Sequence, residues 1–156
     1  MDSAHDCTRR AASTSRKPME CLLRKSPDQL SPVMIYRLTV NGFDLEDVKD
    51  MLALSDLYST KKIMGRIVDK PIRPAQRQGN KQPKRLNSQQ SAVAFQYAKV
   101  LEHATNVFGT QKLAEEWLGR PCRYLDGDVP LDVIVNPVGF LAVSDYLERI
   151  EYGVYQ

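Results

Sequence analysis

The stretch that decides the fold lies near the C-terminus, where residues 117–121 read Trp-Leu-Gly-Arg-Pro and residues 130–132 read Pro-Leu-Asp. A glycine after an apolar run is typical of a helix end, and Pro130 is typical of a helix start. Residues 147–156 read Leu-Glu-Arg-Ile-Glu-Tyr-Gly-Val-Tyr-Gln, an end that contains two tyrosines and a valine. Because apolar residues usually pack, we expect this end either to dock on the protein's own core or to enter a partner.

The elements around this stretch also read as helices. Residues 87–90, Asn-Ser-Gln-Gln, resemble a capping box, and the helix that follows is expected to end at Gly109. Thr110 then caps a short helix, and Pro137 begins the last one. In that last helix four apolar residues recur at intervals of three and four, which indicates a stripe suited to helix packing. These residues are Phe140, Val143, Leu147 and Ile150.

The first half of the chain predicts shorter helices. Ser31-Pro32 starts one that Asn41-Gly42 ends, with Met34, Ile35 and Leu38 as its apolar residues, and Asp44 precedes a second. Ser55 or Ser59 caps a third, whose buried face is expected to be Ile63, Met64, Ile67 and Val68. We therefore predict an all-α fold: a flexible basic arm over residues 1–25, a helix-turn-helix domain over 26–86 and a second helical domain over 87–156.

Charge divides along the same line. Residues 1–90 hold 17 basic and 10 acidic side chains, a net charge of +7, whereas residues 91–156 hold 5 and 9, a net charge of −4. Between residues 59 and 85 nine basic side chains face one acid, Asp69. Such a run is either a solvated face or a surface for phosphate groups, and its single sign favours DNA. The predicted DNA-binding residues are Lys61, Lys62, Arg66, Lys70, Arg73, Arg77, Lys81, Lys84 and Arg85.

Several separate motifs give the second half a family resemblance. They are Phe108-Gly109, Ala114-Glu115-Glu116-Trp117-Leu118, Leu125-Asp126-Gly127, Pro130-Leu131-Asp132, Gly139 and Arg149-Ile150-Glu151-Tyr152-Gly153-Val154. In this order, over residues 91–156, they resemble the Xre/MbcA/ParS toxin-binding domain of antitoxins that are paired with RES-domain toxins. Upstream, from about Ser31, the resemblance to the Xre-like helix-turn-helix half of that family is looser.

The resemblance implies a function that the composition does not. RES-domain toxins deplete NAD, and antitoxins of this kind block the toxin's active-site cleft with their C-terminal end while their first half represses the operon by binding operator DNA. On this implication the toxin-binding residues are Arg149, Glu151, Tyr152, Gly153, Val154, Tyr155 and Gln156. The expected partners are a cognate RES-domain toxin, operator DNA and a second copy of the chain, in a hetero-oligomer with the toxin.

Other classes of function find less support. No glycine-rich phosphate loop is present, neither histidine lies in a catalytic motif, and the Asp126-Gly127-Asp128 sequence is first of all a turn signal. We expect no enzymatic activity, no cofactor and no metal. Three cysteines without a close pair favour a reducing, cytoplasmic setting, and no apolar run approaches the ~20 residues of a membrane span.

Three alternatives remain open at the level of sequence. The reading helix of the helix-turn-helix covers residues 59–68 in one alignment and begins near Asp69 in another, where Pro71 and Pro74 would interrupt it. The protein is an antitoxin, or else a transcription regulator or chromosome-binding protein without a toxin partner. A homodimer is expected from the symmetry of operators, with residues 97–108 and 140–150 as candidate surfaces.

Overall fold

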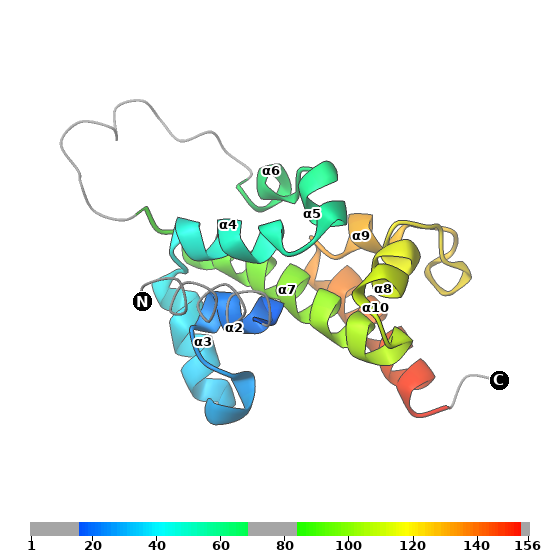
Figure 1. Ribbon diagram of the computed structural model, residues 1–156, viewed down its shortest axis with the longest axis horizontal. Helices are drawn as coiled ribbons and strands as arrows, with labels where there is room; N and C mark the ends of the chain where they lie inside the picture. Colours follow the sequence, from blue (N-terminus) through cyan, green and yellow to red (C-terminus); the bar gives the residue numbers. More distant parts are fainter. Residues whose placement is uncertain (1–15, 69–83, 154–156) are drawn as a thin grey trace, which may run out of the picture.

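A computed structural model describes residues 16–68 and 84–153, and every regular element in these two ranges is helical (Figure 1). The predicted all-α fold is therefore confirmed. In chain order the elements are α2 (Pro18–Leu23), the 3-10 turn η1 (Pro27–Gln29), α3 (Pro32–Asn41), α4 (Leu45–Ala53), α5 (Asp56–Thr60), α6 (Ile63–Ile67), α7 (Ser88–Phe108), α8 (Gln111–Leu118), the 3-10 turn η3 (Arg123–Leu125), α9 (Pro130–Val133) and α10 (Pro137–Glu151).

The 21-residue helix α7 is the central element, and Figure 1 shows it running through the middle of the molecule. Its start is the predicted capping box. The Gln90 amide donates to the Asn87 side chain over 2.8 Å, and the Asn87 amide donates to the Gln90 side chain over 3.0 Å. Its end is also as predicted, because Gly109 takes the left-handed conformation with φ +92°.

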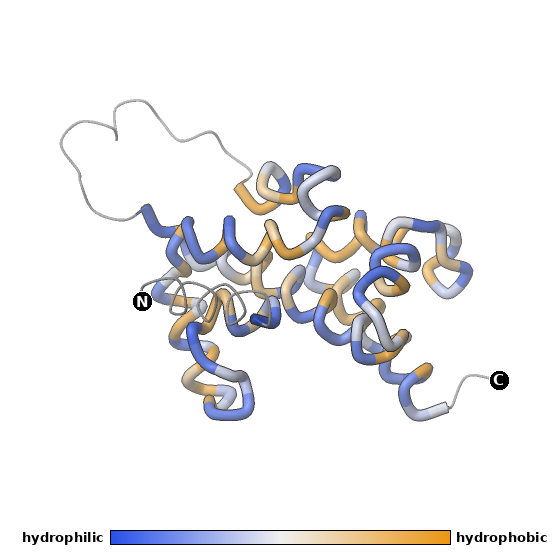
Figure 2. Tube along the Cα trace, in the orientation of Figure 1, coloured by the Kyte–Doolittle hydropathy of each residue, from blue (hydrophilic) through white to orange (hydrophobic). Residues whose placement is uncertain are grey.

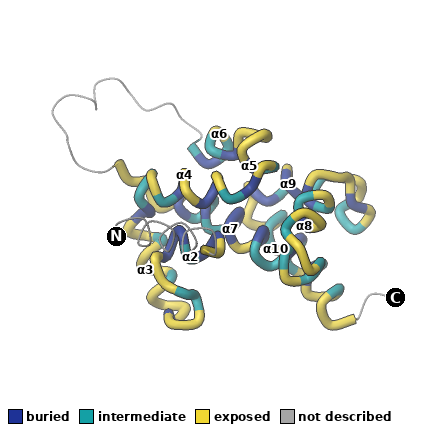
Figure 3. The backbone as a smooth tube through the Cα atoms, viewed as in Figure 1, coloured by how far each residue is buried: buried dark blue, intermediate teal, exposed yellow. Residues whose placement is uncertain are grey.

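Helices from both halves of the chain pack on α7. It contacts α2, α3 and α6 from the first half and α8 and α10 from the second. Ala94, Ala98 and Ala104 are fully buried along it, and such small side chains let neighbouring helices approach closely. The expected domain boundary between residues 86 and 87 falls at the start of α7, and the buried side chains on both sides of it belong to one hydrophobic cluster (Figure 3).

Hydroxyl and amide caps start the other helices largely where the sequence places them. The side chain of Ser31 accepts from the Met34 amide over 3.2 Å, and that of Thr110 accepts from the Leu113 amide over 3.2 Å. Asn136 accepts from the amides of Val138 and Gly139 at the start of α10. These bonds satisfy amides that have no partner within the helix itself.

Part of the segment expected to be a flexible basic arm, residues 1–25, is helical. Residues 18–23 form helix α2, in which Met19, Cys21, Leu22 and Leu23 are buried against the core. Arg24 ends this helix in the left-handed conformation, and its guanidinium donates to Asp47 over 2.8 Å. A segment that buries four apolar side chains is part of the fold. Residues 1–15 lie outside the described ranges.

The third helix expected near residues 59–68 is two helices of one turn or slightly more, α5 and α6. Ser55, and not Ser59, provides the cap, since it accepts from the Tyr58 amide over 3.2 Å. Lys62 interrupts the helix because its backbone is left-handed, with φ +53°. The expected inner face is correct at Ile63 and Ile67, which are both buried, whereas Met64 and Val68 are half-buried.

Both surfaces expected to hold a homodimer together are used within one chain. Tyr97 and Leu101 of α7 have no exposed surface, and neither do Val143 and Leu147 of α10. The two helices pack on each other and close the core of the second half. The middle of the apolar stripe of α10 therefore packs within one chain, and a role of either helix in a dimer stays a prediction.

Candidate functional site

The first turn of α10 is seated closely on the end of α9. A Cβ placed on Gly139 would lie 2.1 Å from the Val133 carbonyl oxygen, so only glycine permits this approach. Asn136 caps the same turn. The position of α10, and hence of the C-terminal end of the described chain, is fixed at its start by backbone packing.

A ladder of aromatic rings fixes the later turns of α10. Tyr146 of α10 stacks on Trp117 of α8, with ring centroids 5.5 Å apart and planes 10° apart. Phe108 extends the ladder on one side at 5.5 Å, and Tyr124 of η3 on the other at 4.9 Å. Stacked rings add directional contacts to the burial of apolar area. The ladder therefore joins α10 to the end of α7, to α8 and to η3.

Arg149, one of the predicted toxin-binding residues, lies at the edge of this ladder. Its Nε donates to the Asp145 carboxylate over 3.0 Å, and its guanidinium lies over the Tyr124 ring, 5.7 Å from the centroid. The Tyr124 hydroxyl donates to the same carboxylate, and this hydrogen bond, followed by the effect of Arg149, lowers the pKa of Asp145 below its ordinary value. Arg149 is half exposed and held in a defined position on the surface.

The described chain leaves the body of the protein after Glu151, the last residue of α10. Glu151 forms an ion pair with His103 of α7 at 3.0 Å when the imidazole is protonated. Tyr152 is 74% exposed and does not pack on the core. At Gly153 the backbone turns out of the helix with φ +65°, and a side chain there would meet nothing within 4 Å. For Tyr152 the expectation of docking on the core is therefore not met, while Val154, Tyr155 and Gln156 lie outside the described residues.

Two of the predicted DNA-binding cations form ion pairs within the chain. Arg66 of α6 donates to the Leu131 carbonyl over 3.2 Å and to the Asp132 carboxylate over 2.9 Å, which links α6 to α9. Arg85 pairs with Asp44 at 3.2 Å. Both side chains are partly engaged in holding the fold, and Arg66 in particular is only 32% exposed.

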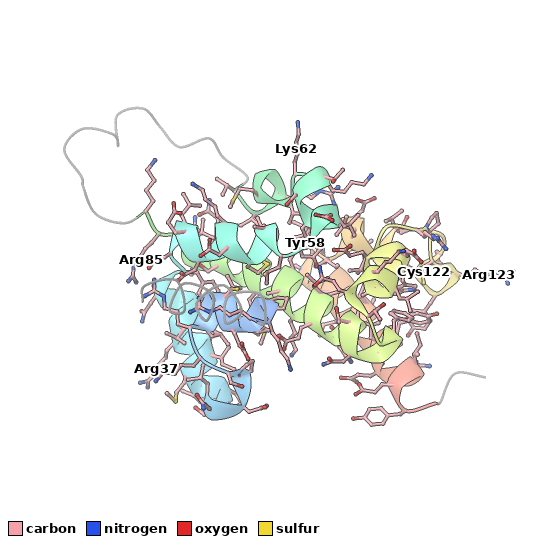
Figure 4. All side chains as sticks on the ribbon, viewed as in Figure 1. Arg37, Tyr58, Lys62, Arg85, Cys122 and Arg123 are labelled. Carbon is pink, nitrogen blue, oxygen red and sulfur yellow. The ribbon has the colours of Figure 1, made fainter. Side chains whose placement is uncertain are left out.

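The remaining described cations lie at two places. Lys61 and Lys62 are exposed at the turn between α5 and α6, and Figure 4 shows Lys62 pointing away from the body. Lys84 is exposed next to Arg85, just before α7, and Figure 4 shows that Arg85 is well separated from Lys62. The other four predicted cations, Lys70, Arg73, Arg77 and Lys81, lie outside the described ranges.

Polar contacts that the sequence does not reveal join α5 to the second half. The Ser55 hydroxyl donates to the Glu115 carboxylate over 2.6 Å, and the Gln111 amide donates to the Leu54 carbonyl over 2.7 Å. The Tyr58 hydroxyl, fully buried, donates to the Tyr97 carbonyl over 2.8 Å. These partners are 39 to 60 residues apart in sequence, so no local pattern could indicate them.

The described residues offer few of the features of a catalytic or metal site. No group of three or more histidine, cysteine or acidic side chains lies close enough together within them to hold a metal ion. Cys21 and Cys122 are buried, and burial raises the pKa of the Cys21 thiol, which disfavours the reactive thiolate. Within the same ranges, no helix combines the length and the apolar character that crossing a membrane requires.

Comparison with protein families gives a match for the segment that contains α8, α10 and the aromatic ladder. Residues 103–153 match the family model of the antitoxin Xre/MbcA/ParS C-terminal toxin-binding domain. The matched segment runs from the second half of α7 to Gly153 and includes the aromatic ladder. It confirms the resemblance over this range, which is shorter than the expected 91–156. Comparison with curated proteins gives no match to the chain.

Proposed function

We propose that this chain, whose residues 103–153 form an antitoxin toxin-binding domain of the Xre/MbcA/ParS family, is the antitoxin to a RES-domain toxin that degrades NAD. Its C-terminal end, from Arg149 onward, enters the toxin's active-site cleft and prevents NAD from binding. One observation carries this proposal: the described end of the chain projects from a rigid helix and leaves Tyr152 74% exposed.

The support comes from the way α10 is held. An inhibitor that fills a cleft binds more tightly when its contact residues are already positioned, because less conformational freedom is lost on binding. The aromatic ladder and the Gly139 contact hold α10, while Asp145 and Tyr124 orient Arg149. Tyr152 then offers a large ring with a polar tip, which is typical of interface anchors.

We further propose that the first half binds operator DNA as part of a homodimer and represses the operon. The charge of +7 over residues 1–90 supports an anionic partner. Lys61, Lys62 and Lys84 are the described cations that are exposed and best suited to phosphate contacts. Arg66 and Arg85 contribute less than the sequence suggests, because both pair with acids of the same chain. The register of the reading helix and the roles of the four cations outside the described ranges stay predictions.

A second candidate is a DNA-binding regulator without a toxin partner. The uneven charge of the two halves is equally consistent with it. A gene for a RES-domain toxin beside the gene for this chain favours the antitoxin, and its absence favours the regulator.

The test measures NAD loss catalysed by the purified neighbouring toxin in the presence of the full chain and of two variants. Tyr152→Ala is expected to weaken protection of NAD, because it removes an exposed anchor. Tyr36→Ala is the matched control, since Tyr36 on α3 is also largely exposed, at 66%, and is not part of the toxin-binding domain. Equal protection by both variants would place inhibition on another surface.

A further inference from the structure

We propose that the exposed face of α10, which runs from Val138 to Glu148 and adjoins Tyr152, is the surface that holds the toxin. The inference rests on the proposed function and deepens it, because it separates the residues that give affinity from the C-terminal end that gives inhibition. The partner surface that fits this face is an apolar patch on the toxin with a basic group beside it.

The exposed face of α10 has helical spacing. Its residues follow one another at intervals of three, four, three and four, so they lie on a single side of the helix. All of them are exposed, whereas Val143 and Leu147 of the same helix are fully buried. The residues of the face and its continuation are Val138, Leu141, Asp145, Glu148 and Tyr152. The face therefore leads along the helix directly to the C-terminal end of the described chain (Figure 1).

The beginning of this face is apolar. Val138 is 73% exposed and Leu141 is 63% exposed. The other large apolar side chains that are exposed within residues 103–153 are Leu113 of α8, Val135 just before α10, and Tyr152. The exposed apolar surface of this segment therefore gathers on α10 and at its two ends. Such a gathering marks an interaction site, whereas single exposed apolar residues do not.

The apolar part of the face is held in place by the body of the protein. The buried Gln96 side chain of α7 donates to the Ile134 carbonyl over 2.7 Å, which fixes the turn between α9 and α10. Gly139, the residue after Val138, lies against the Val133 carbonyl. A partner that binds such a fixed face orders little of it, so less of the binding free energy is lost as conformational entropy.

The family match and the position of the face point to the toxin as its occupant. Residues 103–153, which include the whole of α10, match a toxin-binding domain, and α10 carries most of the exposed apolar surface of that segment. The face also continues into Tyr152, part of the end proposed to enter the toxin's cleft. A toxin that receives this end approaches α10 at its last turn, and the exposed side of the helix is then free to contact it.

The charge of α10 disfavours the two other proposed partners. The helix contains three acidic residues and one basic residue, a net charge of −2, and Figure 2 shows that its last turns are mostly hydrophilic. A negative helix repels the phosphates of DNA, and it repels the same helix of a second copy. Asp145 is paired with Arg149, whereas Glu148 is exposed on the face itself. A complementary toxin surface therefore places a basic group opposite Glu148.

The test measures binding of the purified neighbouring toxin to the full chain by calorimetry, with two substitutions at equivalent helix positions. Val138 of α10 and Val33 of α3 each follow the proline that starts their helix, and both are exposed, at 73% and 59%. Glutamate is tolerated there by either helix, because the first turn favours negative charge. Val138→Glu should raise the dissociation constant about 10–100-fold, because it places a charge against an apolar patch. Val33→Glu should leave the constant unchanged, because α3 lies outside the toxin-binding domain.

A second variant and two further measurements keep the result interpretable. Leu141→Ala removes apolar area without adding charge, and it should weaken toxin binding in the same direction by a smaller factor. Circular dichroism establishes that each variant is folded. A folded Val138→Glu chain that binds the toxin as tightly as the natural chain would overturn the proposal, and loss of affinity in Val33→Glu alone would place the toxin on α3. If sedimentation equilibrium shows that Val138→Glu converts a natural dimer into a monomer, a second copy covers this face and the proposal is wrong.

Protection of NAD separates this proposal from the proposed function. Val138→Glu should protect NAD fully once its concentration exceeds the raised dissociation constant, because its C-terminal end is unchanged. A chain that ends at Glu151 should bind the toxin and protect NAD at no concentration. If that truncated chain no longer binds the toxin, the face of α10 does not hold it, although the proposed function stands. If Val138→Glu weakens binding while the truncated chain protects NAD fully, the face holds the toxin and the proposed function fails.

Discussion

The close contact between α10 and α9 makes a quantitative prediction for Gly139→Ala. The added methyl group would lie 2.1 Å from the Val133 carbonyl oxygen, whereas side-chain carbons essentially never approach closer than 3.0 Å, so the two helices must separate by at least 0.9 Å (3.0 less 2.1). The obstructing atom belongs to the backbone and cannot rotate away. Overpacking of this kind costs about 1–3 kcal/mol of unfolding free energy.

Gly65→Ala provides the matched control for this substitution. Gly65 also lies within a helix, but a Cβ there meets nothing within 4 Å. Replacing glycine by alanine at such a site stabilises a protein by about 0.4–1 kcal/mol. Thermal unfolding should therefore give a melting temperature about 2–12 °C lower for Gly139→Ala and a slightly higher one for Gly65→Ala. Equal melting temperatures for Gly139→Ala and the natural chain would refute the claim that this contact fixes α10.

Three further predictions test individual contacts. Burial holds the pKa of Tyr58 well above its ordinary value, so its hydroxyl stays a hydrogen-bond donor to the Tyr97 carbonyl. Tyr58→Phe should therefore lower the free energy of unfolding, measured in urea, by about 0.5–1.5 kcal/mol. An unchanged free energy would mean that the hydrogen bond to α7 contributes nothing. The pKa of Asp145 is lower in the folded chain than its ordinary value of 3.8, so the ionised carboxylate stabilises the fold at pH values above 3.8, and this contribution is lost as the pH falls through the folded pKa. Tyr124→Phe should raise the pKa of Asp145 in an NMR titration, and an unchanged pKa would show that the hydroxyl does not act on it. Lys62→Ala should reduce the slope of the logarithm of the operator-binding constant against the logarithm of the salt concentration by about 0.9. Arg66→Ala should instead lower the stability of the fold, because it removes the ion pair with Asp132. The reverse result would mean that the roles of the two cations are exchanged.

The ends of a helix can be predicted from the sequence where a local signal marks them. The capping box and Gly109 delimit α7 because both act within four residues of the helix end. The sequence does not indicate helix α2, because six residues are fewer than two turns and give no periodicity. The sequence does not indicate the division between α5 and α6 either. It depends on the left-handed backbone of Lys62, and lysine has no preference for that conformation. The predicted resemblance, in contrast, rests on several anchors, and the family match confirms it.

The functional residues were harder to predict, because their roles depend on partners distant in sequence. Charge alone predicts a DNA contact for Arg66, which stays a prediction, but it cannot reveal the ion pair with Asp132, which is 66 residues away. The apolar residues of α3 predicted a helix correctly, yet periodicity cannot say whether a face meets its own core or another molecule. The sequence likewise cannot say whether Tyr152 packs on the core, and its side chain, 74% exposed, does not.

The central claim is that the end of the chain, and not the body of the domain, inhibits the toxin. Deleting residues 152–156 tests it most directly, because α10 ends at Glu151 and Tyr152 does not pack on the core. The deletion should leave the melting temperature and operator binding of the full chain unchanged and should abolish protection of NAD from the purified toxin. Full protection by a chain that ends at Glu151 would contradict the account.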